Sequence, residues 1–69
     1  MELRWDCTML VYRGRLCNNV HLEKETELME ECLDGEPILR IVGGRYNGWY
    51  FALDDAWVRA YVQPTAQAA

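Results

Sequence analysis

Three cysteines and one histidine are the residues of this 69-residue chain best suited to catalysis or metal binding: Cys7, Cys17, His21 and Cys32. Three thiolates and an imidazole would suit tetrahedral zinc, but no Cys-x-x-Cys spacing places two ligands on one turn. Cys17 and His21 could act as a nucleophile and base, yet we identify no third group to orient the base and no oxyanion site. We therefore predict a protein without metal, cofactor or enzymatic activity.

The cysteine count also bears on the state of the thiols and on the compartment. An odd number of widely spaced cysteines cannot all pair within one chain, so we predict reduced thiols that are mostly buried. No apolar run approaches the roughly 18 residues of a membrane span, and residues 1–4 lack the layout of a signal peptide. These features predict a cytoplasmic protein of the host cell, with no membrane partner.

Carboxylates form the strongest charge pattern in the sequence. Seven of the eleven acidic residues lie in residues 23–36, where Lys24 is the only cation. With seven carboxylates against one ammonium, this segment has a formal charge of −6 in a chain of net charge −4, so the flanking segments are slightly basic. Such a concentration of one sign predicts an anionic patch that a basic partner could bind.

A helix over residues 22–34 would bring most of these carboxylates together. At 100° per residue, Leu22, Met29 and Leu33 fall within a narrow arc, and the frequent Glu, Leu, Met and Lys all favour helix. Asp34-Gly35 is suited to end such a helix. The predicted acidic stripe lies on the side turned away from the apolar arc and consists of Glu23, Glu27, Glu30, Glu31 and Asp34.

This acidic stripe has three interpretations. It could be a solvated surface that keeps a small protein soluble, since acidic helix faces are common. It could imitate the charge of a nucleic-acid backbone and occupy a channel lined by lysine and arginine on another protein. It could bind a divalent cation, although the sequence lacks the glycine and ligand spacing of an EF-hand. Like charges three or four residues apart cost about 0.2 to 0.5 kcal/mol per pair, so the stripe is poor for stability alone.

Six of the eight aromatic residues lie in residues 46–61. A strand over residues 57–62 would direct Val58, Ala60 and Val62 inward and would direct Trp57, Arg59 and Tyr61 outward. The outward residues could pack on the sheet surface, or they could form a protein-binding hot spot, because Trp, Tyr and Arg dominate such anchors. Stacking on single-stranded bases uses the same residue types, but the acidic segment would repel phosphate and disfavours direct nucleic-acid binding.

The other elements are predicted from alternation and from turn residues. Residues 3–12 alternate as a half-buried strand does, with Leu3, Trp5, Cys7, Met9 and Val11 on one side. The turn Arg13-Gly14-Arg15 would lead into a short strand at 16–20. Residues 38–46 and 49–53 would form a hairpin across Asn47-Gly48, because both central positions of a tight hairpin turn need positive φ.

Together these elements predict an α+β fold, with a small antiparallel sheet of four to five strands and one acidic amphipathic helix across it. A small SH3-like barrel is the alternative. Residues 1–63 would form a single domain, because so short a chain can build only one core, and residues 64–69 would form a flexible tail. Chains of this size often gain stability by dimerising or by docking on a larger partner, so we also consider a homodimer.

These features favour a small acidic, non-enzymatic binding protein that inhibits or modulates a nucleic-acid-handling protein through a basic surface on that partner. In composition the chain resembles the small acidic inhibitors encoded by phages and mobile elements, anti-CRISPR proteins among them; this likeness implies an anti-defence inhibitor and assigns no role to any residue. The alternatives are a self-associating structural subunit with an aromatic sheet face, and a nucleic-acid-binding module. The predicted partner-binding residues are Glu23, Glu27, Glu30, Glu31, Asp34, Trp57, Arg59 and Tyr61.

Overall fold

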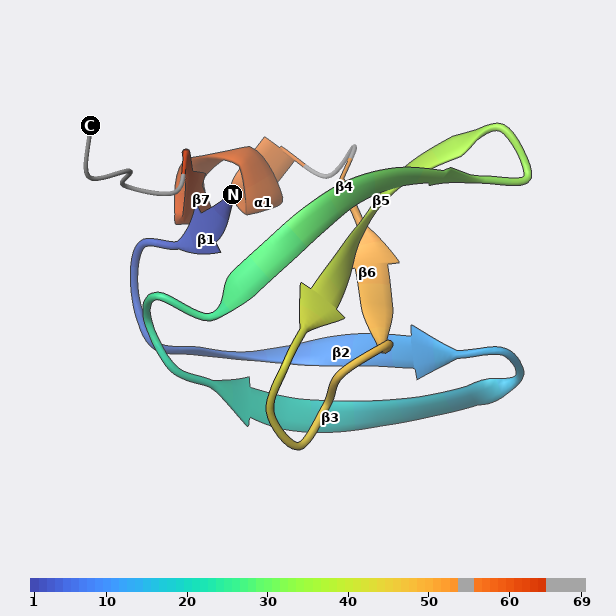
Figure 1. Ribbon diagram of the computed structural model, residues 1–69, viewed down its shortest axis with the longest axis horizontal. Coiled ribbons are helices and arrows are strands. Elements are labelled where there is room, and N and C mark those ends of the chain that lie inside the picture. The colour runs from blue at the N-terminus through green and yellow to red at the C-terminus, as the bar shows by residue number, and fades with distance from the viewer. Residues whose placement is uncertain (54–55, 65–69) are drawn as a thin grey trace.

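Two-residue turns between β-prone segments set the architecture of this protein. The computed structural model describes residues 1–53 and 56–64, and for residues 56 and 57 it describes the backbone alone. Within these residues, seven strands form one antiparallel sheet in the order β3-β2-β6-β5-β4-β1-β7 (Figure 1). In chain order the elements are β1 (Glu2–Leu3), β2 (Cys7–Arg13), β3 (Leu16–Leu22), β4 (Glu27–Leu33), β5 (Glu36–Val42), β6 (Tyr50–Ala52), α1 (Ala56–Tyr61) and β7 (Val62–Gln63).

The β2–β3 hairpin confirms the hairpin predicted around Arg13-Gly14-Arg15. Arg13 pairs with Leu16, so two residues, Gly14 and Arg15, make the turn. Gly14 has a φ of 61°, as the first central position of a type II′ turn requires. Glycine adopts this conformation without the clash that a Cβ would cause, which explains its place there.

The predicted inward side of residues 3–12 is correct except at Trp5. Met9 and Val11 are buried, as the period of two indicates. The predicted strand over residues 3–12 is interrupted at residues 4–6, between β1 and β2. Trp5 lies in that interruption and is 51% exposed, although the alternation placed it inward. The interruption takes Trp5 out of the sheet, so the alternation no longer applies to it.

The predicted helix over residues 22–34 is wrong. Residues 27–33 form β4, which pairs with β5 from Glu27↔Val42 to Leu33↔Glu36. Leu28 is 2% exposed and Met29 is 52% exposed, which is the alternation of a strand. The helical arc would instead have buried Met29.

Turn chemistry and burial explain this correction. Asp34 has a φ of 52° and Gly35 a φ of 81°, so this dipeptide forms the type I′ turn of a hairpin rather than a helix end. Helix propensities of ordinary residues differ by less than about 0.7 kcal/mol, so pairing with β5 and burial of Leu28 override them. Of the carboxylates that would have repelled one another along a helix, those on β4 are divided between its two faces, and Glu23 and Asp34 lie outside the strand.

The hairpin predicted around Asn47-Gly48 exists, but with a longer connection. β5 and β6 pair antiparallel from Ile38↔Ala52 to Arg40↔Tyr50, and residues 43–49 join them. Gly48 has a φ of 92° and lies inside a turn closed by the Trp49 N–H, which donates to the Tyr46 carbonyl at 3.1 Å. The Asn47 side chain accepts a hydrogen bond from the Gly43 N–H at 2.7 Å and holds the loop.

The strand predicted over residues 57–62 is also wrong, because α1 occupies Ala56–Tyr61 and only Val62 belongs to a strand. Val58 is 1% exposed, so its inward position was predicted correctly, whereas Ala60 is exposed. In a helix, residues two apart point in different directions, so the predicted alternation does not hold. Among the described residues, no helix is long and apolar enough to cross a membrane.

The protein is therefore not an α+β fold with a helix across a sheet, and its sheet has seven strands where four to five were predicted. The SH3-like alternative shares the abundance of strands, but β3 and β7 remain the two outer strands of the described sheet. Turns and loops, rather than a helix, connect β2 through β6 (Figure 1). The core draws on most of these strands and consists of Leu3, Met9, Val11, Val20, Leu22, Leu28, Leu39, Ile41, Phe51, Leu53 and Val58.

Candidate protein-binding surface

One edge of β4 is open over most of its length. β1 pairs with β4 only near its start, through Glu2↔Glu27 and through the Leu28 N–H, which donates to the Met1 carbonyl at 2.7 Å. Backbone groups of alternate residues point to the same side of a strand, so those of Glu30 and Cys32 face the same way as those of Leu28. In the described part of the chain, no strand pairs with that edge beyond Leu28.

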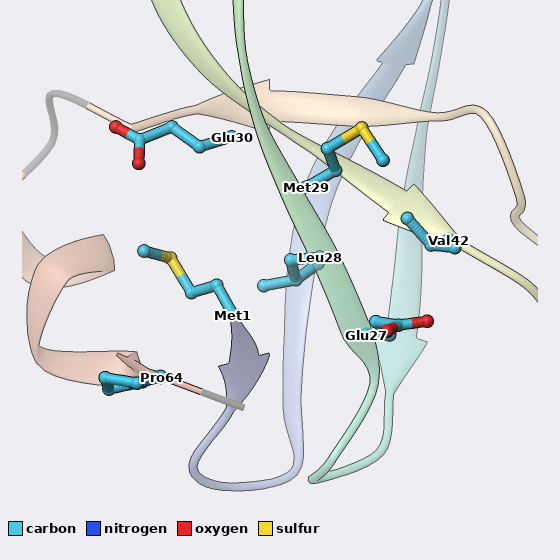
Figure 2. Close-up of a pocket in the computed structure, with 7 residues that line it drawn as sticks. All are labelled: Met1, Glu27, Leu28, Met29, Glu30, Val42 and Pro64. Atoms are coloured by element: carbon cyan, nitrogen blue, oxygen red, sulfur yellow. The ribbon is translucent and has the colours of Figure 1, made fainter. Parts of the chain in front are cut away.

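An open hollow of about 810 Å³ lies along this edge. Figure 2 shows that Leu28 and Glu30 project to one side of β4, while Glu27 and Met29 project to the other. Five apolar side chains and two carboxylates therefore line one groove. We call this surface the acidic groove, and its lining residues are Met1, Glu27, Leu28, Met29, Glu30, Val42 and Pro64.

The structure divides the predicted acidic stripe. Glu27 and Glu31 lie on one face of β4, and Glu30 lies on the opposite face. Glu23 is exposed in the connection between β3 and β4, and Asp34 is exposed in the turn at the far end of β4. Of the five predicted carboxylates, Glu27 and Glu30 line the groove, from opposite faces of β4 (Figure 2).

Glu31 has a structural partner that the sequence interpretation missed. The Arg40 Nε donates to both Glu31 carboxylate oxygens, at 3.1 and 3.0 Å, and the Arg40 Nη1 donates to the Gly48 carbonyl at 2.8 Å. Both side chains are about two-thirds buried, at 31% and 33% exposure. Such charge-assisted bonds hold Glu31 in place, so it is poorly suited to bind a partner. The diagonal placement of Glu31 and Arg40 follows from the β4–β5 register, which a helix prediction conceals.

Aromatic side chains form a row across the sheet, on the face opposite the core. Pairing connects Cys17 to Tyr12, Tyr12 to Tyr50, Tyr50 to Arg40 and Arg40 to Met29. The Tyr12 and Tyr50 ring centroids are 6.1 Å apart, and the Arg40 guanidinium lies 5.4 Å from the centre of the Tyr50 ring. Tyr12 is 38% exposed and Tyr50 is half-buried. The sequence pattern missed this row because it depends on which strands pair.

The predicted C-terminal aromatic patch is not assembled as expected. Arg59 is exposed and Tyr61 is half-buried in α1, and the Tyr61 carbonyl accepts a hydrogen bond from the Arg4 N–H at 2.8 Å. The side chain of Trp57 lies outside the described residues. α1 replaces the strand that was to align these three residues, so they do not form the predicted strand face.

The thiols do not form the zinc or nucleophile sites considered for them. Cys17 and Cys32 are exposed, so the prediction of mostly buried thiols is wrong for both, while Cys7 is half-buried. Burial and then the nearby Asp6 carboxylate raise the pKa of the Cys7 thiol, which makes it a weak nucleophile. Cys17 and His21 are four residues apart on β3, about 13 Å at strand geometry, too far for direct contact. Among the described residues, no three His, Cys, Asp or Glu side chains converge as metal ligands.

Comparison with known proteins offers no counterpart to this surface. The chain matches no family model, no curated protein and no solved structure. The acidic groove combines two carboxylates, apolar side chains and an open strand edge.

Proposed function

We propose that this protein is a non-enzymatic binding protein that inhibits or modulates a nucleic-acid-handling partner by occupying the basic surface of that partner with its acidic groove. The observation that carries the proposal is the concentration of carboxylates in residues 23–36, which run from the connection before β4 to the first residue of β5. The seven carboxylates of residues 23–36 are all exposed or half-buried, and Glu31 is the one with an ion pair among the described residues. The others are available to a cationic partner.

The groove offers a specific way to hold lysine and arginine side chains. Their aliphatic stems can pack on Met1, Met29 and Val42, while their charged ends reach Glu27 on one side of β4 and Glu30 on the other. Nucleic-acid-handling proteins carry such side chains in their channels, because they neutralise phosphates. A strand with carboxylates on both faces can enter a channel of this kind edge first and compete with nucleic acid.

We place this activity in the cytoplasm of the host cell, where thiols remain reduced. The three cysteines are free in the structure, which is compatible with that compartment. An anti-defence inhibitor of the anti-CRISPR type would act there on a nucleic-acid-binding effector. Self-assembly through the aromatic face ranks second, because Glu31 and the partly exposed Arg40 interrupt its apolar surface.

The test compares two double variants of equal charge. Glu27→Gln with Glu30→Gln removes both groove carboxylates, whereas Asp34→Asn with Glu36→Gln removes two exposed carboxylates at the far turn. Wild-type protein immobilised at low salt would be used to capture partners from host lysate, and mass spectrometry would identify them. We expect the captured partner to be a nucleic-acid-binding protein, and we expect added DNA or RNA to displace it. The groove variant should bind this partner at least about tenfold more weakly than wild type does.

The far-turn variant is the matched control for net charge and should bind within a few-fold of wild type. Equal loss in both variants would show that total charge, and not the groove, governs binding. A captured partner that is unaffected by nucleic acid would refute the proposed function even if the groove were its binding site.

A further inference from the structure

β3 is an outer strand of the described sheet, and its free edge is long and uncharged. It pairs with β2 alone over Leu16–Leu22. Leu16 closes the turn against Arg13, so the backbone groups of the alternate residues Cys17, Asn19 and His21 point away from β2. The strand contains no Lys, Arg, Asp, Glu or Pro, which are the residues that proteins use to block such edges.

The open edges of β4 and β7 differ from β3 in this respect. The open edge of β4 carries Glu27, Glu30 and Glu31, which would repel an identical edge. β7 has two residues, too few for extended pairing. Of these three edges, β3 is the one on which a further strand can be added along its whole length without a charge penalty.

The geometry points to a two-fold symmetric dimer in which β3 pairs antiparallel with β3 of a second copy, with Asn19 on the symmetry axis. In this register Cys17 lies opposite the second copy's His21, and Asn19 lies opposite its own equivalent. These three residues are the ones whose backbone groups point outward, so every outward N–H meets an outward C=O. A two-fold axis makes the contact self-complementary, as expected of a closed dimer.

Charge complementarity beyond the strand selects a second copy as the occupant. Continuing the same register by one residue places Arg15 opposite the second copy's Glu23, and the two-fold axis repeats that contact. Both residues are exposed. Within one chain they lie at opposite ends of β3, about 26 Å apart at strand geometry, so they can meet only between two molecules.

The same register also accounts for Leu16, which is 62% exposed. Leu16 would lie opposite the second copy's Leu22, which lines an open hollow of about 330 Å³ together with Ile41 and Tyr46. In the dimer, Leu16 of each copy therefore lies against the partly apolar hollow of the other copy. The two-fold axis makes this contact occur twice. None of the residues paired in this register lines the acidic groove.

A charge-reversal cycle tests this dimer by light scattering after size-exclusion chromatography. Wild type should show a mass near twice the 8.1 kDa of one chain. Arg15→Glu alone places two acids together at each contact, and Glu23→Arg alone places two bases together, so each should weaken association at least about tenfold. The double variant carries both changes in one chain and should restore the dimer, because the two substituted side chains again meet as opposite charges at each contact.

Arg59→Glu is the matched control, because it makes the same charge change at an exposed α1 site and should leave the mass unchanged. If a reversal variant fails to fold by circular dichroism, Asn19→Lys and Asn19→Glu replace it. Each should be monomeric alone, and their mixture should form a heterodimer across the axis. A monomeric wild type at high protein concentration would overturn the proposal, and so would single reversals that leave the mass unchanged.

Discussion

The β2–β3 and β4–β5 hairpins are alike in length but opposite in charge at their turns. Each joins two seven-residue strands through a two-residue turn. Arg13 and Arg15 lie at one turn, Asp34 and Glu36 lie at the other, and Figure 1 shows both turns at the same end of the long axis. Both hairpins bury their inward residues in the same core. Burial and turn conformation thus impose the strand in both cases, while the exposed charge is free to differ.

The largest expected effect separates the strand from the helix at β4. Leu28→Ala should lower the free energy of unfolding by about 2 to 5 kcal/mol, because Leu28 is 2% exposed within the core. Met29→Ala should cost less than about 1 kcal/mol, because Met29 is half exposed. Urea denaturation measures both. A larger loss for Met29→Ala than for Leu28→Ala would contradict the strand and restore the helix.

The second effect compares the two turns. Asp34→Ala should destabilise the protein by about 1 to 2 kcal/mol, because its φ of 52° is unfavourable for a residue without a polar side chain. Asp34→Asn should be nearly neutral, because asparagine tolerates this conformation. At a protein concentration low enough to keep the chain monomeric, Arg15→Ala, in the turn of the other hairpin, should change stability by less than about 0.5 kcal/mol. Equal effects of Asp34→Ala and Arg15→Ala on the denaturation midpoint would argue against the type I′ turn.

A third test concerns Arg40, which joins the outer face of the β4–β5 hairpin to the loop before β6. Arg40→Met removes the bonds to Glu31 and to the Gly48 carbonyl and should cost about 1 to 2 kcal/mol. Arg13→Met, at the exposed turn of the other hairpin, is the control and should cost less than about 0.5 kcal/mol. Thermal unfolding at low protein concentration measures the two. If the two variants lose equal stability, the Arg40 network contributes nothing.

The smallest effect compares a thiol of each hairpin. Burial and Asp6 raise the pKa of the Cys7 thiol above its usual 9.0, so at pH 8 Cys7 should react with a thiol reagent more slowly than the exposed Cys32. Because the folded state retains this proton, the contribution of Cys7 to stability should be constant well below pH 9 and should fall as the pH rises past it, since the unfolded chain ionises first. Asp6→Asn should speed the Cys7 reaction. Mass spectrometry of labelled peptides would reveal any reversal of the two rates.

Local patterns in the sequence determined several features of this protein. Alternation at Met9 and Val11 and the glycine between Arg13 and Arg15 predicted the β2–β3 hairpin, because both signals act within a few residues. The β-prone segments around Asn47-Gly48 predicted that β5 and β6 pair, although not the length of their connection. The order of residues alone located the carboxylates in residues 23–36, since formal charge does not depend on the fold.

Tertiary structure decided what local patterns left ambiguous. The segment around Leu28 and Met29 fits a helix by propensity and a strand by alternation, and only pairing with β5 and burial in the core select the strand. The same register determines that Arg40 neutralises Glu31, and the strand places Glu27 and Glu30 on opposite faces of β4, where both line one groove. Contacts of this kind join residues distant in sequence, and their free energy exceeds the small propensity differences from which single-sequence predictions are made.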